Sequence, residues 1–167
     1  MSSNCGCGCG CGDSDPKECP ECEEEGKEVS LKTVINLLNK NKKEEITGED
    51  YHLCMNPECF ISYYSDSKSF TVKDVRQPIW FKKGSTPKIA CYCNNISYAE
   101  VESAVIEHDL TTWNEIVSAY RNNNICECEK FNPTGECCCS QNFYEVVNQV
   151  LESIGEEPVP PEDQCCG

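Results

Sequence analysis

Residues 19–22, Cys-Pro-Glu-Cys, and residues 54–59, Cys-Met-Asn-Pro-Glu-Cys, place two closely spaced cysteine pairs in the first half of the chain. Zinc favours four thiolates in a tetrahedron, and each short pair can supply two of them from a single turn. The pattern therefore predicts a structural zinc site with no open coordination position; the alternatives are another thiophilic metal, or thiol pairs without a metal. The four expected ligands are Cys19, Cys22, Cys54 and Cys59.

The composition indicates why the fold needs such a site. The chain has 167 residues, of which 38% are hydrophobic and 17 are cysteines. A hydrophobic core this small usually needs bound metal or disulfide bonds to stabilise the fold. We predict metal, because C-x-C, C-x-x-C and C-C neighbours are poorly placed to form disulfides with each other, and an odd number of cysteines cannot all pair. Residues 1–15 show no signal-peptide pattern, so a reducing, cytoplasmic location is expected.

Charge and motif content exclude several classes of function. The net charge of −15 disfavours binding to nucleic acid or to an anionic membrane surface. No stretch approaches the roughly 18 apolar residues of a membrane span. No Ser-His-Asp set, phosphate-binding glycine loop or pair of catalytic carboxylates stands out. We therefore expect a protein that is not an enzyme.

Short apolar runs between polar turns predict β-structure in the first half, with one helix. The helix is expected from Ser30, with Val34, Leu37 and Leu38 on one face. Strands are expected over Tyr51–Leu53, Phe60–Tyr64 and Ser69–Val72, with a short edge strand over Pro78–Lys82.

The second half carries the start signals of three helices. Ser97 with Glu100, and Thr112 with Glu115, form capping boxes ahead of apolar residues at helical spacing. Ser140 can cap a third helix. The second half is therefore expected to be helical.

A second group of cysteines lies in this helical half. Cys91-Tyr92-Cys93-Asn94 precedes the first capped helix, and Cys126, Cys128 and Cys137-Cys138-Cys139 follow downstream. A [2Fe-2S] cluster needs four thiolates, and backbone N–H groups at helix N-termini offset their charge. The group therefore favours a [2Fe-2S] cluster; a second zinc site is the alternative.

The order and spacing of these motifs are similar to those of a known family. Cys91-x-Cys93-Asn94 before a helix resembles the start of the bacterioferritin-associated ferredoxin domain. Together with CPEC at 19–22, C-x4-C at 54–59 and the run from Cys128 through NPTGECC to Cys138, it resembles the N-terminal domain of CopZ-type copper chaperones, which bears zinc and [2Fe-2S]. The resemblance implies four cluster ligands, Cys91, Cys93, Cys128 and Cys138. Cys126, Cys137 or Cys139 could replace one of the last two.

We predict an α+β protein in two lobes with a tail at each end. The first lobe is a small zinc-stabilised β lobe with one helix, and the second is a helical lobe that binds [2Fe-2S]. The expected boundaries are a disordered Cys/Gly tail over 1–15, the β lobe over 16–82, the helical lobe over 83–155 and an acidic, flexible tail over 156–167.

The tails carry further thiols that suit a soft metal. Cys5, Cys7, Cys9 and Cys11 alternate with glycine, and thiolates of this kind are preferred ligands of Cu(I). The alternative is a low-complexity or redox-sensitive tail without a metal. The C-terminal copper-binding domain of two-domain CopZ proteins is not found in residues 156–167. The tail thiols are therefore the candidate Cu(I) ligands.

Three functions remain open from the sequence. The first is soft-metal handling with electron transfer, with a redox or metal-transport protein as partner. The second is a ferredoxin-like electron-transfer subunit of an oxidoreductase, and the third is a structural or regulatory module held together by its metals.

Overall fold

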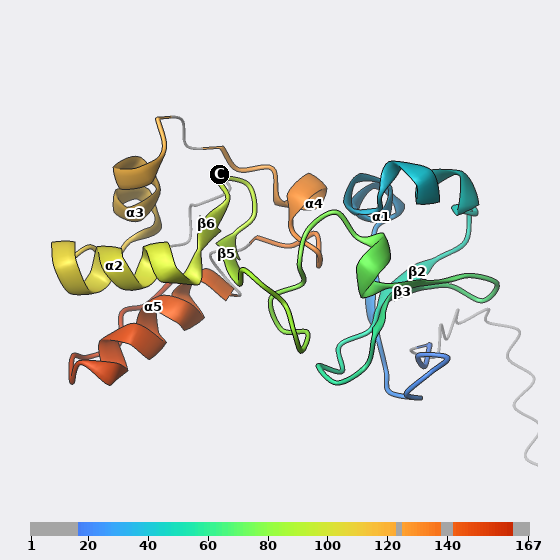
Figure 1. Cartoon of the computed structure of the whole chain (residues 1–167), viewed down its shortest axis with the longest axis horizontal. Coiled ribbons are helices and arrows are strands. Elements are labelled where there is room, and N and C mark those ends of the chain that lie inside the picture. The colour runs from blue at the N-terminus through green and yellow to red at the C-terminus, as the bar shows by residue number, and fades with distance from the viewer. Residues whose placement is uncertain (1–16, 123–124, 138–141, 162–167) are drawn as a thin grey trace, which may run out of the picture.

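This computed structural model describes residues 17–122, 125–137 and 142–161, which form an α+β fold of two lobes (Figure 1). The first lobe is built on a four-stranded antiparallel sheet in the order β1-β2-β3-β4. Its elements are β1 (Lys27–Val29), α1 (Leu31–Leu37), the 3₁₀ helix η1 (Lys40–Glu45), β2 (Tyr51–Leu53), β3 (Ile61–Tyr64), β4 (Ser69–Thr71) and the 3₁₀ helix η2 (Val72–Asp74).

The first lobe has two buried clusters, and β3 contributes to both. Tyr63 packs with Val34 and Leu37 of α1 in an apolar core, whereas Ile61 and Tyr64 pack against cysteines. All four residues of β3 are buried. The predicted helix begins where expected, with the side chain of Ser30 accepting a hydrogen bond from the Thr33 amide at 3.2 Å.

The second lobe packs its helices around a two-stranded sheet. Ser97 and Thr112 cap their helices with complete capping boxes, as the sequence predicts. The side chain of the buried Asn142 donates to the carbonyls of Ile89 and Ala90, so α5 begins against β5. None of the described helices has both the length and the apolar character needed to span a bilayer. The elements are β5 (Ile89–Cys91), β6 (Ile96–Ser97), α2 (Tyr98–His108), α3 (Trp113–Tyr120), α4 (Cys128–Phe131) and α5 (Asn142–Ser153).

Three details of the fold differ from the sequence predictions. The edge strand predicted over Pro78–Lys82 is wrong: this segment makes a turn, in which the Lys82 amide donates to the Ile79 carbonyl at 3.0 Å. Strands β1, β5 and β6 and helix α4 were not expected. In the acidic tail, Val159 exchanges two hydrogen bonds with the side chain of Asn148 on α5, whereas residues 156–158, 160 and 161 are exposed. Ser140 lies outside the described residues.

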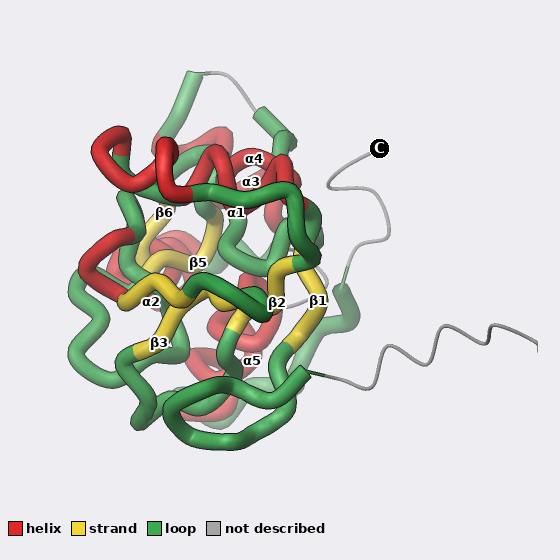
Figure 2. Tube along the Cα trace, turned by 90° about the vertical axis from the view of Figure 1, so that its right-hand side faces the viewer, coloured by secondary structure: helices red, strands yellow, loops and turns green. Residues whose placement is uncertain are grey.

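Helix α4 and the loop after it join the two lobes. Figure 1 shows α4 beside α1 of the first lobe, and Figure 2 shows the same pair from the side. The Thr33 hydroxyl on α1 donates to the Glu129 carbonyl at 2.7 Å, and the buried Tyr63 hydroxyl donates to the Pro133 carbonyl at 2.5 Å. Gly135 has a φ of +73° and approaches Thr33 so closely that a Cβ there would lie 2.6 Å from its hydroxyl oxygen.

Gly135→Ala tests this joint. The new methyl group would both strain a left-handed residue and overlap Thr33, and overpacking of this kind costs about 1–3 kcal/mol beyond the strain itself. The matched control is Gly84→Ala, where φ is +80° but nothing lies within 4 Å of the added Cβ. Denaturant unfolding of the metal-loaded proteins should show the larger loss for Gly135→Ala. Equal losses would contradict the close contact between the lobes.

Candidate metal centres

The structure brings together the four cysteines that the sequence predicts as zinc ligands. The Sγ atoms of Cys19, Cys22, Cys54 and Cys59 all lie within 4.8 Å of one another. The distance between the Sγ atoms is 3.9 Å for Cys19 and Cys59, and 3.7 Å for Cys22 and Cys54. Zinc–sulfur bonds of about 2.3 Å in a tetrahedron place sulfur atoms about 3.8 Å apart. The arrangement therefore has the dimensions of a tetrahedral zinc site.

Two loops hold these sulfur atoms in place. The first is a tight turn in which the Cys19 amide donates to the Glu24 carbonyl at 2.8 Å and the Glu23 amide donates back to the Cys19 carbonyl at 2.9 Å. The second loop links β2 to β3, and the Cys54 amide donates to Ser62 across that hairpin at 2.8 Å. Both pairs therefore converge because β-structure fixes the ends of their loops.

The sulfur atoms of Cys22, Cys54 and Cys59 each accept a hydrogen bond from the backbone amide two residues further along the chain. These hydrogen bonds stabilise the thiolate and so oppose the rise in pKa that burial causes. Burial raises the pKa of the Cys54 thiol to about 12, while the Asn56 amide and the charge of Lys82 oppose the rise. Burial also raises the pKa of Cys59, against a hydrogen bond from the Ile61 amide. At Cys22 burial acts in the same direction, but hydrogen bonds from the Glu24 amide and the other cysteines outweigh it and lower the pKa.

The surroundings of this site contain a tyrosine, a histidine and a lysine. The hydroxyl of Tyr64 donates to the Lys17 carbonyl, and burial raises its pKa to about 12, so it remains a donor. His52 stacks on Tyr64 with ring centroids 5.8 Å apart, which fits a packing role. The Nζ atom of Lys82 donates to two carbonyls of the second loop. Sequence reasoning missed Lys82, because nothing in the local sequence marks a contact 23 residues away.

The second group of cysteines gathers where β5, α4 and the loop after α4 meet. The Sγ atoms of Cys93 and Cys128 are 3.4 Å apart, and the Glu127 amide donates to the Cys93 sulfur at 3.2 Å. Cys126, Cys128 and Cys137 have sulfur atoms within 4.8 Å of one another. The structure thus brings two of the predicted ligands into direct contact.

The remaining predicted ligands are Cys91 and Cys138. Cys91 is fully buried at the end of β5 and forms a hydrogen bond with Cys93. Cys138, like the alternative Cys139, lies outside the described residues. Cys126 and Cys137 are disulfide-bonded in the structure, whereas Cys91, Cys93 and Cys128 are thiols. The contacts of Cys93 with Cys128 and Cys91, together with burial, place the Cys93 pKa well above its usual value.

Asn94 ties this second group together. Its side-chain amide, in a residue that is 6% exposed, donates to the Cys91 sulfur at 3.5 Å and to the Ile125 carbonyl at 2.7 Å. Its side-chain oxygen accepts from the Ile125 amide at 3.0 Å. Arg121 in turn donates from Nε to the Asn94 carbonyl at 2.8 Å. Asn94 therefore fixes the Cys91–Cys93 loop against the segment that leads to Cys128.

The four N-terminal cysteines predicted to bind Cu(I), at positions 5, 7, 9 and 11, lie outside the described residues. In the described residues the buried Nδ1 atom of His52 has no hydrogen-bond partner, and its ring stacks on Tyr64.

Known proteins resemble the chain in both sequence and fold. Residues 16–76 match the family model zf_CopZ, described as a zinc binding domain. The chain is similar to the X-ray structure of the Archaeoglobus fulgidus CopZ N-terminal domain, with 26% sequence identity and a TM-score of 0.62 over 86% of this chain and 100% of that chain. No curated protein matches the chain.

These matches do not test the likeness of the second half to bacterioferritin-associated ferredoxin, which stays a prediction. They do support metal binding by the four-cysteine cluster, because the family match covers Cys19, Cys22, Cys54 and Cys59. Residues 16–76 thus match a zinc-binding domain of the CopZ type, and the chain has the fold of a CopZ N-terminal domain.

Proposed function

We propose that this chain handles soft metals with the help of electron transfer, using a structural zinc in the first lobe and a redox-active [2Fe-2S] cluster in the second. The observation that carries the proposal is the contact between Cys93 and Cys128, whose sulfur atoms lie 3.4 Å apart beside the buried Cys91. These residues come from segments more than 30 positions apart, and thiolates are the ligands that such a cluster requires. The proposed cluster ligands are Cys91, Cys93, Cys128 and Cys138.

The residues around the proposed cluster suit its chemistry. When bound, a [2Fe-2S] cluster supplies one-electron transfer at a potential set by its hydrogen bonds and exposure. The Asn94 side chain and the Glu127 amide donate to the sulfur atoms of Cys91 and Cys93, which stabilises negative charge there. No catalytic role is proposed for any residue; the chain binds and transfers rather than converts a substrate.

A surface hollow beside Cys93 favours electron exchange with another protein. One of the residues that line the hollow is Cys93, a proposed cluster ligand. A redox partner docked over the hollow would therefore be close to the proposed cluster. Its lining residues are Cys93, Asn94, Asn95, Arg121, Asn122 and Ile125. The same feature supports the second candidate function, an electron-transfer subunit of an oxidoreductase. The proposed partner of the chain is therefore a redox or metal-transport protein.

Metal removal tests the structural zinc. Because a structural zinc contributes about 10–16 kcal/mol to folding, its removal by a chelator should unfold the first lobe. Hydrogen exchange over β2 and β3 should become fast in the metal-free protein and slow again when zinc returns. The Cys93→Ala variant, which leaves the four-cysteine site intact, should keep its zinc and its slow exchange. Strands that stay protected after complete loss of zinc would contradict the structural role.

Anaerobic metal and sulfide analysis, with EPR of the reduced protein, tests the cluster. We expect about two irons and two sulfides per chain and a visible absorption that dithionite bleaches. Cys93→Ser should lose the cluster, whereas the matched variant Cys126→Ser should keep it. A colourless protein with zinc at both sites would reject the cluster, and loss of iron in Cys126→Ser would reassign one ligand.

A Cu(I) titration tests the role of the tails. Soft thiolates prefer Cu(I), so the full chain should bind more copper than a version limited to residues 16–164, which lacks Cys5, Cys7, Cys9, Cys11, Cys165 and Cys166. Zinc and iron content should be the same in both proteins. Equal copper stoichiometry and affinity would remove metal handling by the tails and leave electron transfer as the better function.

A further inference from the structure

Lys82 is a buried cation without an acidic partner among the described residues. It is 4% exposed, and its Nζ atom donates to the carbonyls of Asn56 at 2.8 Å and Cys59 at 3.1 Å. The ion pairs of the described chain involve other lysines and Arg121. Its neighbour Lys83, in contrast, is exposed and pairs with Glu58 at 2.8 Å. A buried charge is costly unless a compensating charge lies close by.

With zinc bound, the four-cysteine site would supply that compensating charge. A divalent zinc ion with four thiolates carries a net charge of about −2. Asn56 and Cys59, the residues that accept hydrogen bonds from Lys82, belong to the loop that provides two of the four sulfur atoms. The ammonium group is therefore positioned against the site whose charge it can balance.

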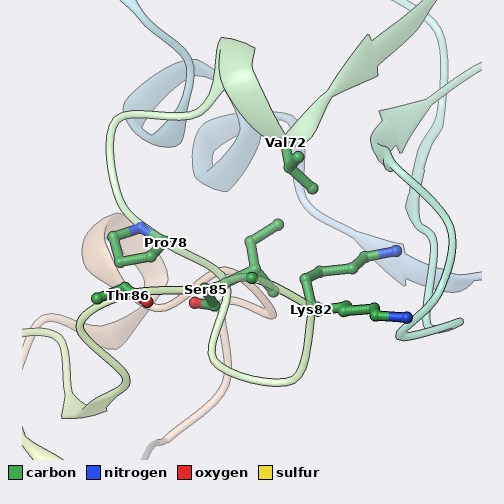
Figure 3. A pocket seen from close by; sticks show the side chains of 8 residues that line it. Val72, Pro78, Lys82, Ser85 and Thr86 are labelled. Carbon is green, nitrogen blue, oxygen red and sulfur yellow. The ribbon is translucent and has the colours of Figure 1, made fainter.

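The turn that carries Lys82 is itself fixed in place. The Trp80 amide donates to the Tyr92 hydroxyl at 3.0 Å, and this hydroxyl donates to the Pro78 carbonyl at 2.5 Å. Figure 3 shows Lys82 in this turn with Pro78, Ser85 and Thr86, opposite Val72. The ring of Phe81 lies 5.7 Å from the Lys82 ammonium. The cation is held by a preformed turn from outside the matched zinc-binding domain, residues 16–76.

We propose that Lys82 is the counter-cation of the four-cysteine metal site and raises the affinity of that site for zinc. The inference rests on zinc binding by Cys19, Cys22, Cys54 and Cys59, and extends the site to a residue beyond the zinc-binding domain. Lys82 is a positioning residue: it touches the ligand loop through two carbonyls and acts on the metal through its charge.

Zinc affinity of the full chain, measured by competition with a chromophoric chelator, tests the proposal. Lys82→Met keeps an unbranched side chain one atom shorter but removes the charge, and should weaken zinc binding about 10- to 100-fold, as the loss of a residue that supports the metal ligands does. Lys82→Arg keeps the charge and should recover most of the affinity. Lys83→Met, the control, removes an exposed charge of the same kind and should bind zinc like the parent protein.

A further variant separates charge from hydrogen bonding. Lys82→Gln can still donate to a carbonyl but is neutral, so it should bind zinc as weakly as Lys82→Met. Cobalt in place of zinc should give the same tetrahedral absorption spectrum in all variants, because the ligands are unchanged. Full affinity in Lys82→Gln, or equal weakness in Lys82→Arg and Lys82→Met, would overturn the proposal. A parent protein that binds no zinc would instead overturn the zinc site itself.

Discussion

Mutual repulsion between four sulfur ligands is the constraint on which the first lobe depends. Sulfur atoms within 4.8 Å of one another cannot all be thiolates unless a cation lies between them, and burial raises the pKa of Cys54 and Cys59. Without metal these thiols keep their protons, and metal binding replaces the protons. Because β2 ends directly before Cys54 and β3 begins two residues after Cys59, the sheet and the metal site form together.

Each of the two groups of cysteines has a basic side chain that donates hydrogen bonds to the backbone of its loop, although the chain has a net charge of −15. Lys82 donates to carbonyls of the loop between Cys54 and Cys59, and Arg121 donates to the carbonyls of Asn94 and Asn95 next to Cys93. Positive charge is thus brought to the loops where negative sulfur gathers, while the surface remains acidic.

Local signals explain what the sequence could predict. Capping residues such as Ser30, Ser97 and Thr112 act within four positions, so their helices were placed correctly. Short cysteine spacings likewise predicted that Cys19, Cys22, Cys54 and Cys59 lie together, and that Cys93 lies near Cys128. The single-turn helix α4 and the two-residue strand β6 are too short to show a hydrophobic period. The apolar run around Trp80 was predicted as a strand, but its amide bonds to Tyr92 and the chain turns instead.

Helix α4 gives the molecule an order of assembly. The segment that begins at Cys128 and leads to Cys137 is seated on α1 and β3 by Thr33 and Tyr63, so its anchorage exists only once the first lobe has formed. If the second lobe binds the proposed [2Fe-2S] cluster, the segment that carries Cys128 would be anchored for iron only after zinc has ordered the first lobe. Zinc supply would then act as a checkpoint on loading of the proposed cluster, through the contacts of Thr33 and Tyr63, neither of which is a metal ligand.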